Sequence, residues 1–260
     1  MKVLFKVMKD FPSYLWSGWG AISSIFVFIA CWEWGSQVYG ELVLPAPMKT
    51  FTILVELLQT PSVLEQILLT TQRAITGFLI SMAAGSVLGL LAGLFLTASM
   101  MSRPLVTIFM GMPPIAWIVL AMIWFGMSDS TVVFTVVVSS FPIVFAGAIQ
   151  GTRTLEGDLK EMCDSFHLPV HMKFTQLYAP HIFSYIFPTW VSALGMSWKI
   201  VVMAELLASN DGVGAMLATA RAHLDTPTAI ALVVVMVGSL MAIEYIILEP
   251  FKREVELWRD

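Results

Sequence analysis

Residues 161–180 read Glu161-Met-Cys-Asp-Ser-Phe-His-Leu-Pro-Val-His-Met-Lys-Phe-Thr-Gln-Leu-Tyr-Ala-Pro180. They continue the longest charge-rich stretch of the chain, which holds four acids, three bases and two histidines between Arg153 and Lys173. Uncharged runs of membrane length lie on both sides of this stretch. A loop in that position lies at the membrane surface, where it is either solvated or docked onto another protein. The sequence therefore predicts a surface loop between two membrane spans, either solvated or docked.

The composition is that of an integral membrane protein. Hydrophobic residues make up 58% of the chain, charged residues 12%, and the mean hydropathy is +0.83. A soluble domain carries about 25% charged residues, so this chain lacks the charge to cover a soluble surface. Two cysteines are at different predicted depths, so no disulfide is expected. We find no internal repeat and no linker, and we expect one transmembrane domain over residues 1–260.

Six uncharged windows predict six membrane-spanning helices. Each window holds at least 18 residues, and crossing a bilayer as a helix takes roughly 20. The windows show no two-residue alternation, so helices are expected and not the strands of a membrane barrel. The predicted fold is therefore all-α. The windows are Phe11–Trp32, Ala74–Ser102, Pro104–Ser128, Ser130–Thr152, Phe174–Trp198 and Thr226–Ile243.

The distribution of basic residues predicts the orientation. An even number of spans places both termini on one side. If that side is the cytoplasm, ten basic residues lie inside and three lie outside, which satisfies the positive-inside rule. The charged loop then faces the cytoplasm. The inner set is Lys2, Lys6, Lys9, Arg103, Arg153, Lys160, Lys173, Lys252, Arg253 and Arg259, and the outer set is Lys49, Arg73 and Arg221.

Two features inside the spans predict a solute path. Adjacent Pro113 and Pro114 remove two backbone donors, so the third span must kink or unwind near the middle of the membrane. Broken helices at that depth often line a transport path, although a kink that only fits neighbouring helices is the alternative. Met110, Met112 and Trp117 flank the break and are candidate gate residues.

Lys199 and Glu205 are the charged residues predicted within or near the fifth span. A charge at the centre of a spanning helix costs on the order of 3 kcal/mol, so both should face protein or water. On an unbroken helix, six positions place them on different faces, and a direct ion pair would need a bend. Lys199 either favours an anionic solute in the path or only stabilises the helix through local pairing.

Glycines in the second span predict close helix packing. Gly77, Gly85, Gly89 and Gly93 recur at intervals of four or eight residues. In lipid, a face of small residues lets two helix backbones approach closely, and local flexibility is the alternative role.

These residues together resemble the permeases of binding-protein-dependent ABC importers, in the nitrate/sulfonate/taurine group. The resemblance covers most of the chain from Leu44 to Trp258, and its specificity lies in the order and spacing of the motifs. They are Leu44-Pro-Ala-Pro47, Arg73 with Gly77, Pro113-Pro-Ile-Ala-Trp117, Trp124-Phe-Gly126, Phe141-Pro142, Gly151, Trp198, Ala204-Glu205 and Gly212-Val-Gly214.

The charged loop resembles the EAA loop of that family, through which an ATPase drives the permease. The family pattern is Glu-Ala-Ala, three residues, Gly, nine residues, an aliphatic residue, one residue and Leu-Pro. This chain departs most at His167, which replaces the family glycine, and we expect Pro169 to preserve the turn with altered backbone angles. The resemblance implies that ATPase coupling involves Glu161, Met162, Cys163, Asp164, His167, Leu168, Pro169, Leu177 and Pro180.

The resemblance further implies a type I ABC importer permease (MetI-like) fold in a bacterial inner membrane. Two copies would form the path, two ATP-binding subunits would dock on the loops, and a periplasmic or lipid-anchored binding protein would deliver the solute. The group resembled handles small anions such as nitrate, sulfonates and bicarbonate, and also neutral heterocyclic vitamin precursors. The chain has no Gly-x-x-x-x-Gly-Lys-Ser/Thr motif, so the partner would bind ATP and Mg²⁺, and this chain is expected to be neither an enzyme nor a cofactor or nucleic-acid binder.

Two other classes of protein are less consistent with the sequence. A secondary transporter or channel would leave the charged loop unexplained, and the halves show no inverted repeat. An intramembrane enzyme would need a catalytic cluster at membrane depth. His167 and His171 have a helical metal-binding spacing, but Pro169 lies between them and the loop is at the surface, so no metal site is expected.

Overall fold

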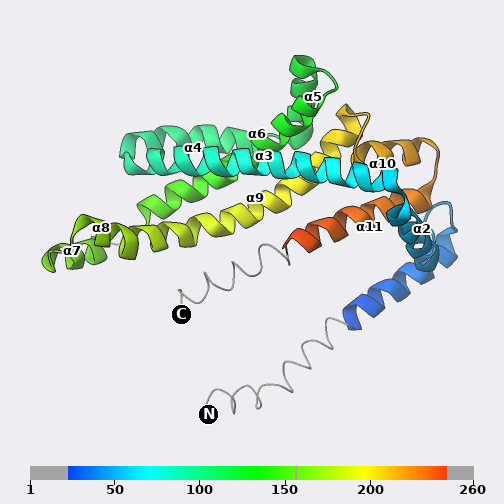
Figure 1. Ribbon diagram of the computed structural model, residues 1–260, viewed down its shortest axis with the longest axis horizontal. Coiled ribbons are helices and arrows are strands. Elements are labelled where there is room, and N and C mark those ends of the chain that lie inside the picture. Colours follow the sequence, from blue (N-terminus) through cyan, green and yellow to red (C-terminus); the bar gives the residue numbers. More distant parts are fainter. Residues whose placement is uncertain (1–22, 156, 245–260) are drawn as a thin grey trace, which may run out of the picture.

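The computed structural model describes residues 23–155 and 157–244. All the regular secondary structure in these two segments is helical, with no strand in either, as the composition predicts. Figure 1 shows long helices packed side by side. After a first helix over 23–39, the elements are α2 Pro47–Gln59, α3 Pro61–Leu94, α4 Leu96–Gly111, α5 Pro114–Phe125, α6 Asp129–Arg153, α7 Gly157–Ser165, α8 Val170–Lys173, the π-helical turn η1 Phe174–Tyr178, α9 Ala179–Ala208, α10 Val213–Ala222 and α11 Thr226–Ile243.

Within the described residues, four helices are long and apolar enough to cross a membrane, and a bent pair makes a fifth span if its two helices cross as one. The four are Pro61–Leu94, Asp129–Arg153, Val170–Ala208 and Thr226–Ile243, and the pair is α4 with α5. The predicted first span, Phe11–Trp32, lies partly outside the described residues. The described segments therefore support four of the six predicted spans, and a fifth if the bent pair is one span.

Charged residues mark the ends of α6, Asp129–Arg153, but they do not end the other helices where the uncharged windows assume that they do. Arg73 lies inside α3, and Arg103 lies inside α4. The boundary between these helices is instead Phe95, whose backbone is extended with φ −112° and ψ 123°. The fifth window ends at Trp198, whereas α9 continues to Ala208. Arg73 can stay within a helix because its guanidinium finds acidic partners inside the protein, as described below.

Proline sets the start of several helices. In α2, α3, α5, α9 and α11 a proline occupies the first or second helical position. The missing N–H of proline is harmless there, because the first backbone donors of a helix have no partner within it. Pro180, the last residue of the predicted coupling pattern, has this position in α9.

The predicted close packing of the second span is confirmed. An added Cβ at Gly77 would lie 2.5 Å from Val136 Cγ1, and one at Gly89 would lie 2.6 Å from the carbonyl oxygen of Phe145. Side chains at these positions would push α3 away from α6. The glycines in such contact with α6 are Gly77, Gly85, Gly89 and Gly93.

The predicted break of the third span is also confirmed. The axes of α4 and α5 differ by 91°. Met112 and Pro113 between them have extended backbones, with ψ 124° and 139°. Across the bend, the rings of Phe109 and Trp117 stack with centroids 5.3 Å apart. The two prolines therefore replace one straight span by two short helices at a right angle.

The core lies where α9 packs between α3, α6 and the C-terminal helices. Its buried residues include Val136, Trp198, Val201 and Leu232. The Trp198 ring nitrogen donates to Ser239 Oγ at 3.1 Å. In Figure 1, α7 and α8 lie at one end of this bundle, while α2 and α10 lie at the opposite end. The two candidate sites described next are at these two ends.

Candidate functional site

The predicted coupling loop folds into a helix–turn–helix. The His167 N–H donates to the Asp164 carbonyl oxygen at 3.0 Å, and the Leu168 N–H donates to the Cys163 carbonyl oxygen at 3.1 Å. This pair of bonds is a Schellman motif, which closes the C-terminus of α7. Pro169 follows with an extended backbone, φ −63° and ψ 148°, and precedes α8. The loop is thus a structured element.

His167 has a left-handed backbone conformation, with φ +51°. The expected turn therefore forms, and it does so in the backbone region that favours glycine. A residue with a side chain is disfavoured there by roughly 1–2 kcal/mol, but histidine tolerates the region better than most residues. The His167 Nδ1 lies 3.0 Å from the Ser165 carbonyl oxygen, a local hydrogen bond that offsets part of this strain. The Schellman motif therefore forms without glycine.

The loop has a packed interior and an apolar outer surface. Cys163 is buried, and Lys173 pairs with Asp164 across the turn. Glu161 and Asp164 are exposed, and Leu168, Leu177 and Pro180 are partly buried. Four large apolar side chains project outward with exposed fractions of 50–82%, an arrangement that fits docking better than solvation. We call Met162, Phe166, Val170 and Phe174 the apolar loop patch.

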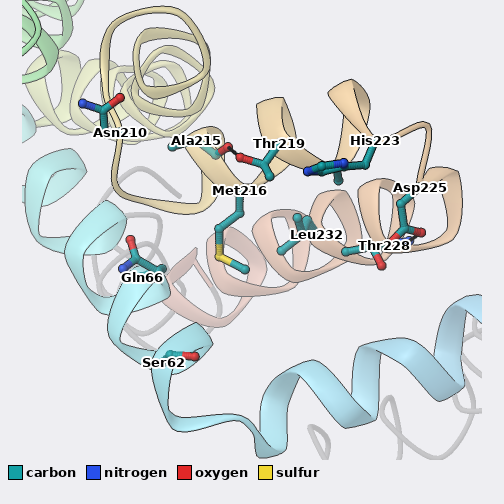
Figure 2. A pocket seen from close by; sticks show the side chains of 11 residues that line it. Ser62, Gln66, Asn210, Ala215, Met216, Thr219, His223, Asp225, Thr228 and Leu232 are labelled. Carbon is teal, nitrogen blue, oxygen red and sulfur yellow. Dashed lines mark hydrogen bonds between the residues drawn. The ribbon is translucent and has the colours of Figure 1, made fainter.

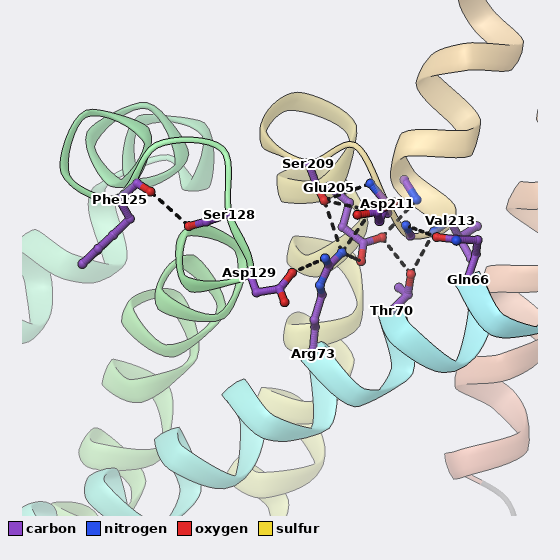
Figure 3. A network of polar contacts seen from close by, with 12 residues as sticks. Gln66, Thr70, Arg73, Phe125, Ser128, Asp129, Glu205, Ser209, Asp211 and Val213 are labelled. Carbon is purple, nitrogen blue, oxygen red and sulfur yellow. Dashed lines mark hydrogen bonds and ion pairs between the residues drawn. The ribbon is translucent and has the colours of Figure 1, made fainter.

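A buried polar network occupies the opposite end of the bundle (Figure 3). Glu205 on α9 is fully buried. Its carboxylate accepts hydrogen bonds from Arg73 Nη1 at 2.7 Å, Thr70 Oγ1 at 2.8 Å and the Gly214 N–H at 3.1 Å. A buried carboxylate needs such compensation, because an unpaired charge in an apolar interior is strongly unfavourable.

Arg73 connects four parts of the chain through this network. Besides Glu205, its guanidinium donates to the Asp211 carbonyl oxygen at 3.0 Å and to Ser209 Oγ at 3.3 Å. Its other terminal nitrogen pairs with Asp129 at the start of α6. Arg73 is 5% exposed, whereas Asp129 is 71% exposed. The network therefore links α3, α6, α9 and the segment before α10, and it reaches the surface at Asp129.

The turn that covers Glu205 requires glycine. Gly212 has φ +97°, and an added Cβ would lie 2.3 Å from Glu205 Cδ. A Cβ at Gly214 would lie 2.4 Å from the Val202 carbonyl oxygen. The Gly212-Val-Gly214 sequence thus lets the backbone approach the carboxylate closely enough for the Gly214 N–H to donate to it.

The sequence singled out Glu205 but did not identify its partner. Arg73 was assigned to an outer loop because it borders an uncharged window. Two observations from the sequence could have suggested the pair. Glu205, in an apolar segment, needs a cationic partner, and Arg73 lies at the edge of another apolar segment. Lys199 is exposed on α9 and makes no ion pair with Glu205, as six positions on an unbroken helix require.

The candidate gate residues gather at the bend between α4 and α5. Met110 and Pro113 are exposed, and Met112, Pro114 and Trp117 are partly buried. The Trp117 ring nitrogen is buried and has no hydrogen-bond partner within the described residues. Glu205 belongs instead to the buried network near the end of α9, and Lys199 is exposed on α9, so the candidate path residues do not form one cluster.

A pocket of about 480 Å³ lies beside the network, between the start of α3 and helices α10 and α11. Met216 lies among its polar groups (Figure 2), which come from Ser62, Gln66, Asn210, Thr219, His223, Asp225 and Thr228. The pocket is open to the surface and has no basic residue in its wall other than histidine. Within the described residues, no group of three metal-ligating side chains occurs.

A comparison with known protein families identifies the family to which this chain belongs. Residues 85–253 match the family described as binding-protein-dependent transport system inner membrane component. The chain belongs to this family. An ABC transporter permease of Brucella abortus (strain 2308) is 27% identical over 221 residues, covering 85% of this chain and 88% of that protein. An aliphatic sulfonates transport permease of Bacillus subtilis (strain 168) is 26% identical over 238 residues, covering 90% and 85%.

A nitrate import permease of Leptolyngbya laminosa is 27% identical over 150 residues, covering 57% of this chain and 53% of that protein. The resemblance inferred from the motifs is therefore confirmed. As an inner membrane component of a binding-protein-dependent transport system, the chain is a multi-pass ABC importer permease. The helix–turn–helix at one end and the polar network at the other are features of that permease.

Proposed function

We propose that two copies of this permease form the translocation path of an ATP-driven importer for a small anion. Nitrate, sulfonates such as taurine, and bicarbonate are the candidate solutes. The names of the sulfonate and nitrate relatives support this class of solute. Lys199, an exposed cation on a spanning helix, supports it independently, because a charge in a low-dielectric path biases passage toward the opposite sign.

The helix–turn–helix is the proposed docking surface for the ATP-binding subunit. The observation that carries this assignment is the apolar loop patch next to exposed Glu161 on a structured turn. The patch would enter an apolar groove, and Glu161 would make a charge-assisted contact with a basic group at its rim. The partner would hold ATP and Mg²⁺, since this sequence has no phosphate-binding loop of the Walker type.

α9 offers a direct mechanical connection between docking and transport. It runs for 30 residues from the end of the loop to beyond Glu205, which corresponds to about 45 Å of helix. Closure of the ATPase pair would move both loops, and α9 would carry that motion to the network at the opposite end. Rigid-body tilting of this kind is a common form of alternating access. The bend near Met112 and Trp117 is the proposed gate region.

The proposed orientation places the loop and both termini in the cytoplasm, where ATP is available. A binding protein would then deliver the solute to the end that carries the polar network. Single-cysteine variants at Asp164 and at Thr219 would test this orientation in inverted and right-side-out vesicles. An impermeant thiol reagent should reach Asp164→Cys only from the cytoplasmic side and Thr219→Cys only from the other side.

Reconstitution tests the function. The permease, its co-purified ATP-binding subunit and its binding protein would be assembled in proteoliposomes and supplied separately with nitrate, taurine, bicarbonate and a neutral heterocycle. Uptake that needs ATP, the binding protein and one of the anions is the expected result. Uptake without ATP would contradict an importer and favour a secondary transporter. ATP-dependent uptake of only the neutral heterocycle would retain the importer and reject the anion.

A further inference from the structure

A second pocket, of about 410 Å³, lies between α4 and α6 toward the end of the bundle that carries the coupling loop. Its wall contains two arginines, Arg103 and Arg153, and no acidic residue. The neutral polar groups come from Ser99, Ser102, Thr107 and Gln150. A hollow with two guanidinium groups and no carboxylate has the electrostatics of an anion site.

The two arginines lack the partners that neutralise other bases of this chain. Arg73 pairs with Glu205, and Lys173 pairs with Asp164. Neither Arg103 nor Arg153 makes an ion pair or a side-chain hydrogen bond within the described residues. Among the described side chains, their ten N–H donors, five on each guanidinium, therefore have no acceptor.

A buried hydroxyl in the pocket wall is a second, independent observation. Ser99 is 1% exposed, and its Oγ has no hydrogen-bond partner in the described parts of the chain. The neighbouring hydroxyls are already used, since Ser102 donates to the Ser99 carbonyl oxygen at 3.0 Å and Thr107 to the Arg103 carbonyl oxygen at 3.0 Å. An orphaned buried hydroxyl costs about 1–3 kcal/mol. A ligand oxygen in the pocket would satisfy it.

We propose that this pocket binds a phosphate-type oxyanion, supplied by the head group of an anionic phospholipid. Arginine forks match phosphate oxygens in pairs, and basic pockets between transmembrane helices on the cytoplasmic side bind anionic head groups. The cytoplasmic leaflet in this assignment rests on the proposed orientation. Free inorganic phosphate has the same chemistry and is the alternative source of the oxyanion.

An adjoining hollow favours the lipid over the free ion. A pocket of about 700 Å³ shares Arg153 with the first and also has Lys173 in its wall. Its apolar side chains on α3, α4 and α9 are Leu94, Leu96 and Ile182, and Phe174 of the apolar loop patch borders it on the side of the coupling loop. A phosphate at Arg153 would therefore have room beside it for an acyl chain. The bound lipid would hold the ends of α4 and α6 together, next to the segment from which the coupling loop begins.

Lipid retention by the full-length permease tests the site. The protein would be purified into nanodiscs of phosphatidylcholine with a minor fraction of phosphatidylglycerol, and the tightly bound lipid would be measured by native mass spectrometry. The wild type should retain phosphatidylglycerol. Arg103→Gln and Arg153→Gln should each weaken retention by about fivefold, the contribution of one basic residue near an anionic membrane surface. Arg221→Gln, which removes an exposed arginine at the other end of the bundle, should leave retention unchanged.

Ser99→Ala tests the same site through thermal stability without changing the charge of the protein. In nanodiscs of phosphatidylcholine alone, removing the orphaned hydroxyl should leave the thermal midpoint unchanged or raise it. With phosphatidylglycerol present, the same variant should lose part of the stabilisation that the wild type gains, because the hydroxyl then has a partner. An equal effect of Ser99→Ala in both lipids would overturn the role of the hydroxyl.

The source of the oxyanion is resolved in a parallel experiment with inorganic phosphate in phosphatidylcholine nanodiscs. One outcome is that phosphate stabilises the wild type but not the double variant Arg103→Gln/Arg153→Gln, while the wild type and the double variant retain equal amounts of phosphatidylglycerol. In that case the anion site is confirmed and its occupant is a free ion. If neither effect depends on the two arginines, the proposal is overturned. Neither measurement requires transport, so failure of the proposed anion uptake is distinguishable from failure of the lipid site.

Discussion

Arg73 Nη1 lies 2.7 Å from Glu205 Oε1, although 132 residues separate the two in sequence. The pair ties α3 to α9, and the turn at Gly212-Val-Gly214 lies directly over the carboxylate. Both side chains are almost completely buried. A fully desolvated ion pair is expensive to break, because removing one partner leaves the other as an uncompensated charge.

Arg73→Met should therefore destabilise the permease by about 3–5 kcal/mol, and Glu205→Leu by a similar amount. The double variant should be more stable than either single variant, since it leaves no buried charge. Thermal unfolding in detergent, followed by size-exclusion chromatography, measures the order. Asp129→Asn is the matched control, because its exposed carboxylate contributes at most about 1 kcal/mol. Additive effects of the two single substitutions would contradict the pairing.

Gly212→Ala should destabilise the network end of the bundle. Its backbone has φ +97° and ψ 169°, a region that only glycine adopts without strain of about 1–3 kcal/mol. The new methyl group would also clash with the Glu205 carboxylate. Gly238→Ala on α11 is the control, because no heavy atom lies within 4 Å of its added Cβ. The expected result is a lower thermal midpoint for Gly212→Ala only, and equal midpoints would contradict the close approach.

Substitution of His167 tests the left-handed turn of the coupling loop. His167→Gly removes the steric strain at φ +51° but makes the unfolded chain more flexible, so stability should change by less than about 1 kcal/mol. His167→Val should be clearly worse, because a β-branched residue is an outlier at positive φ. Hydrogen exchange of 157–173 should rise only in the valine variant. Equal hydrogen exchange in the glycine and valine variants would contradict the left-handed conformation of residue 167.

Glu161→Lys should uncouple ATP hydrolysis from uptake or release the ATP-binding subunit. The substitution reverses the charge of an exposed side chain beside the apolar loop patch, so it should repel a basic group on the partner. The measurements are co-purification of the ATPase and solute uptake in proteoliposomes. Glu56→Lys reverses an exposed acid on α2, at the opposite end of the bundle, and should change neither. Normal assembly and uptake by Glu161→Lys would remove the loop from the coupling mechanism.

Lys199→Met should reduce anion uptake more than it reduces folding or ATPase binding. Lys199 has no ion-pair partner in the described chain, so its removal leaves no buried charge behind. The same variant should discriminate less between an anion and a neutral analogue of similar size. Unchanged selectivity with normal assembly would assign Lys199 a structural role. That role is the alternative stated above, in which Lys199 only stabilises the helix through local pairing.

The sequence contains the information for those parts of the fold that depend on local chemistry. Consecutive prolines at 113 and 114 remove two donors, and the structure breaks there by 91°. The glycines of α3 mark the face that contacts α6. The acid–turn–proline pattern of the coupling loop likewise marks a surface element. Each of these inferences needs only the backbone or a single helix face.

The parts that depend on distant residues were not predictable in this way. Arg73 was predicted at the edge of a loop, because an unpaired charge within an apolar helix is unfavourable and the sequence did not identify a partner for it. Its partner Glu205 is on α9, 132 residues later in the sequence. The spacing of charges along the chain does not predict that these two residues meet. The left-handed conformation of His167 has a local cause, the Schellman hydrogen bonds of α7, and it was not predicted because a residue with a side chain adopts positive φ less readily than glycine.

The long separation of Arg73 and Glu205 has a consequence for biosynthesis. A ribosome adds about 5–20 residues per second, so roughly 7–26 s pass between synthesis of the two residues. Throughout that interval α3 contains an arginine without its buried partner. An unpaired arginine at the centre of a spanning helix costs about 2.5–3.5 kcal/mol, so we expect α3 to insert less favourably before α9 has been made. Its final position would then be fixed by the pairing with Glu205.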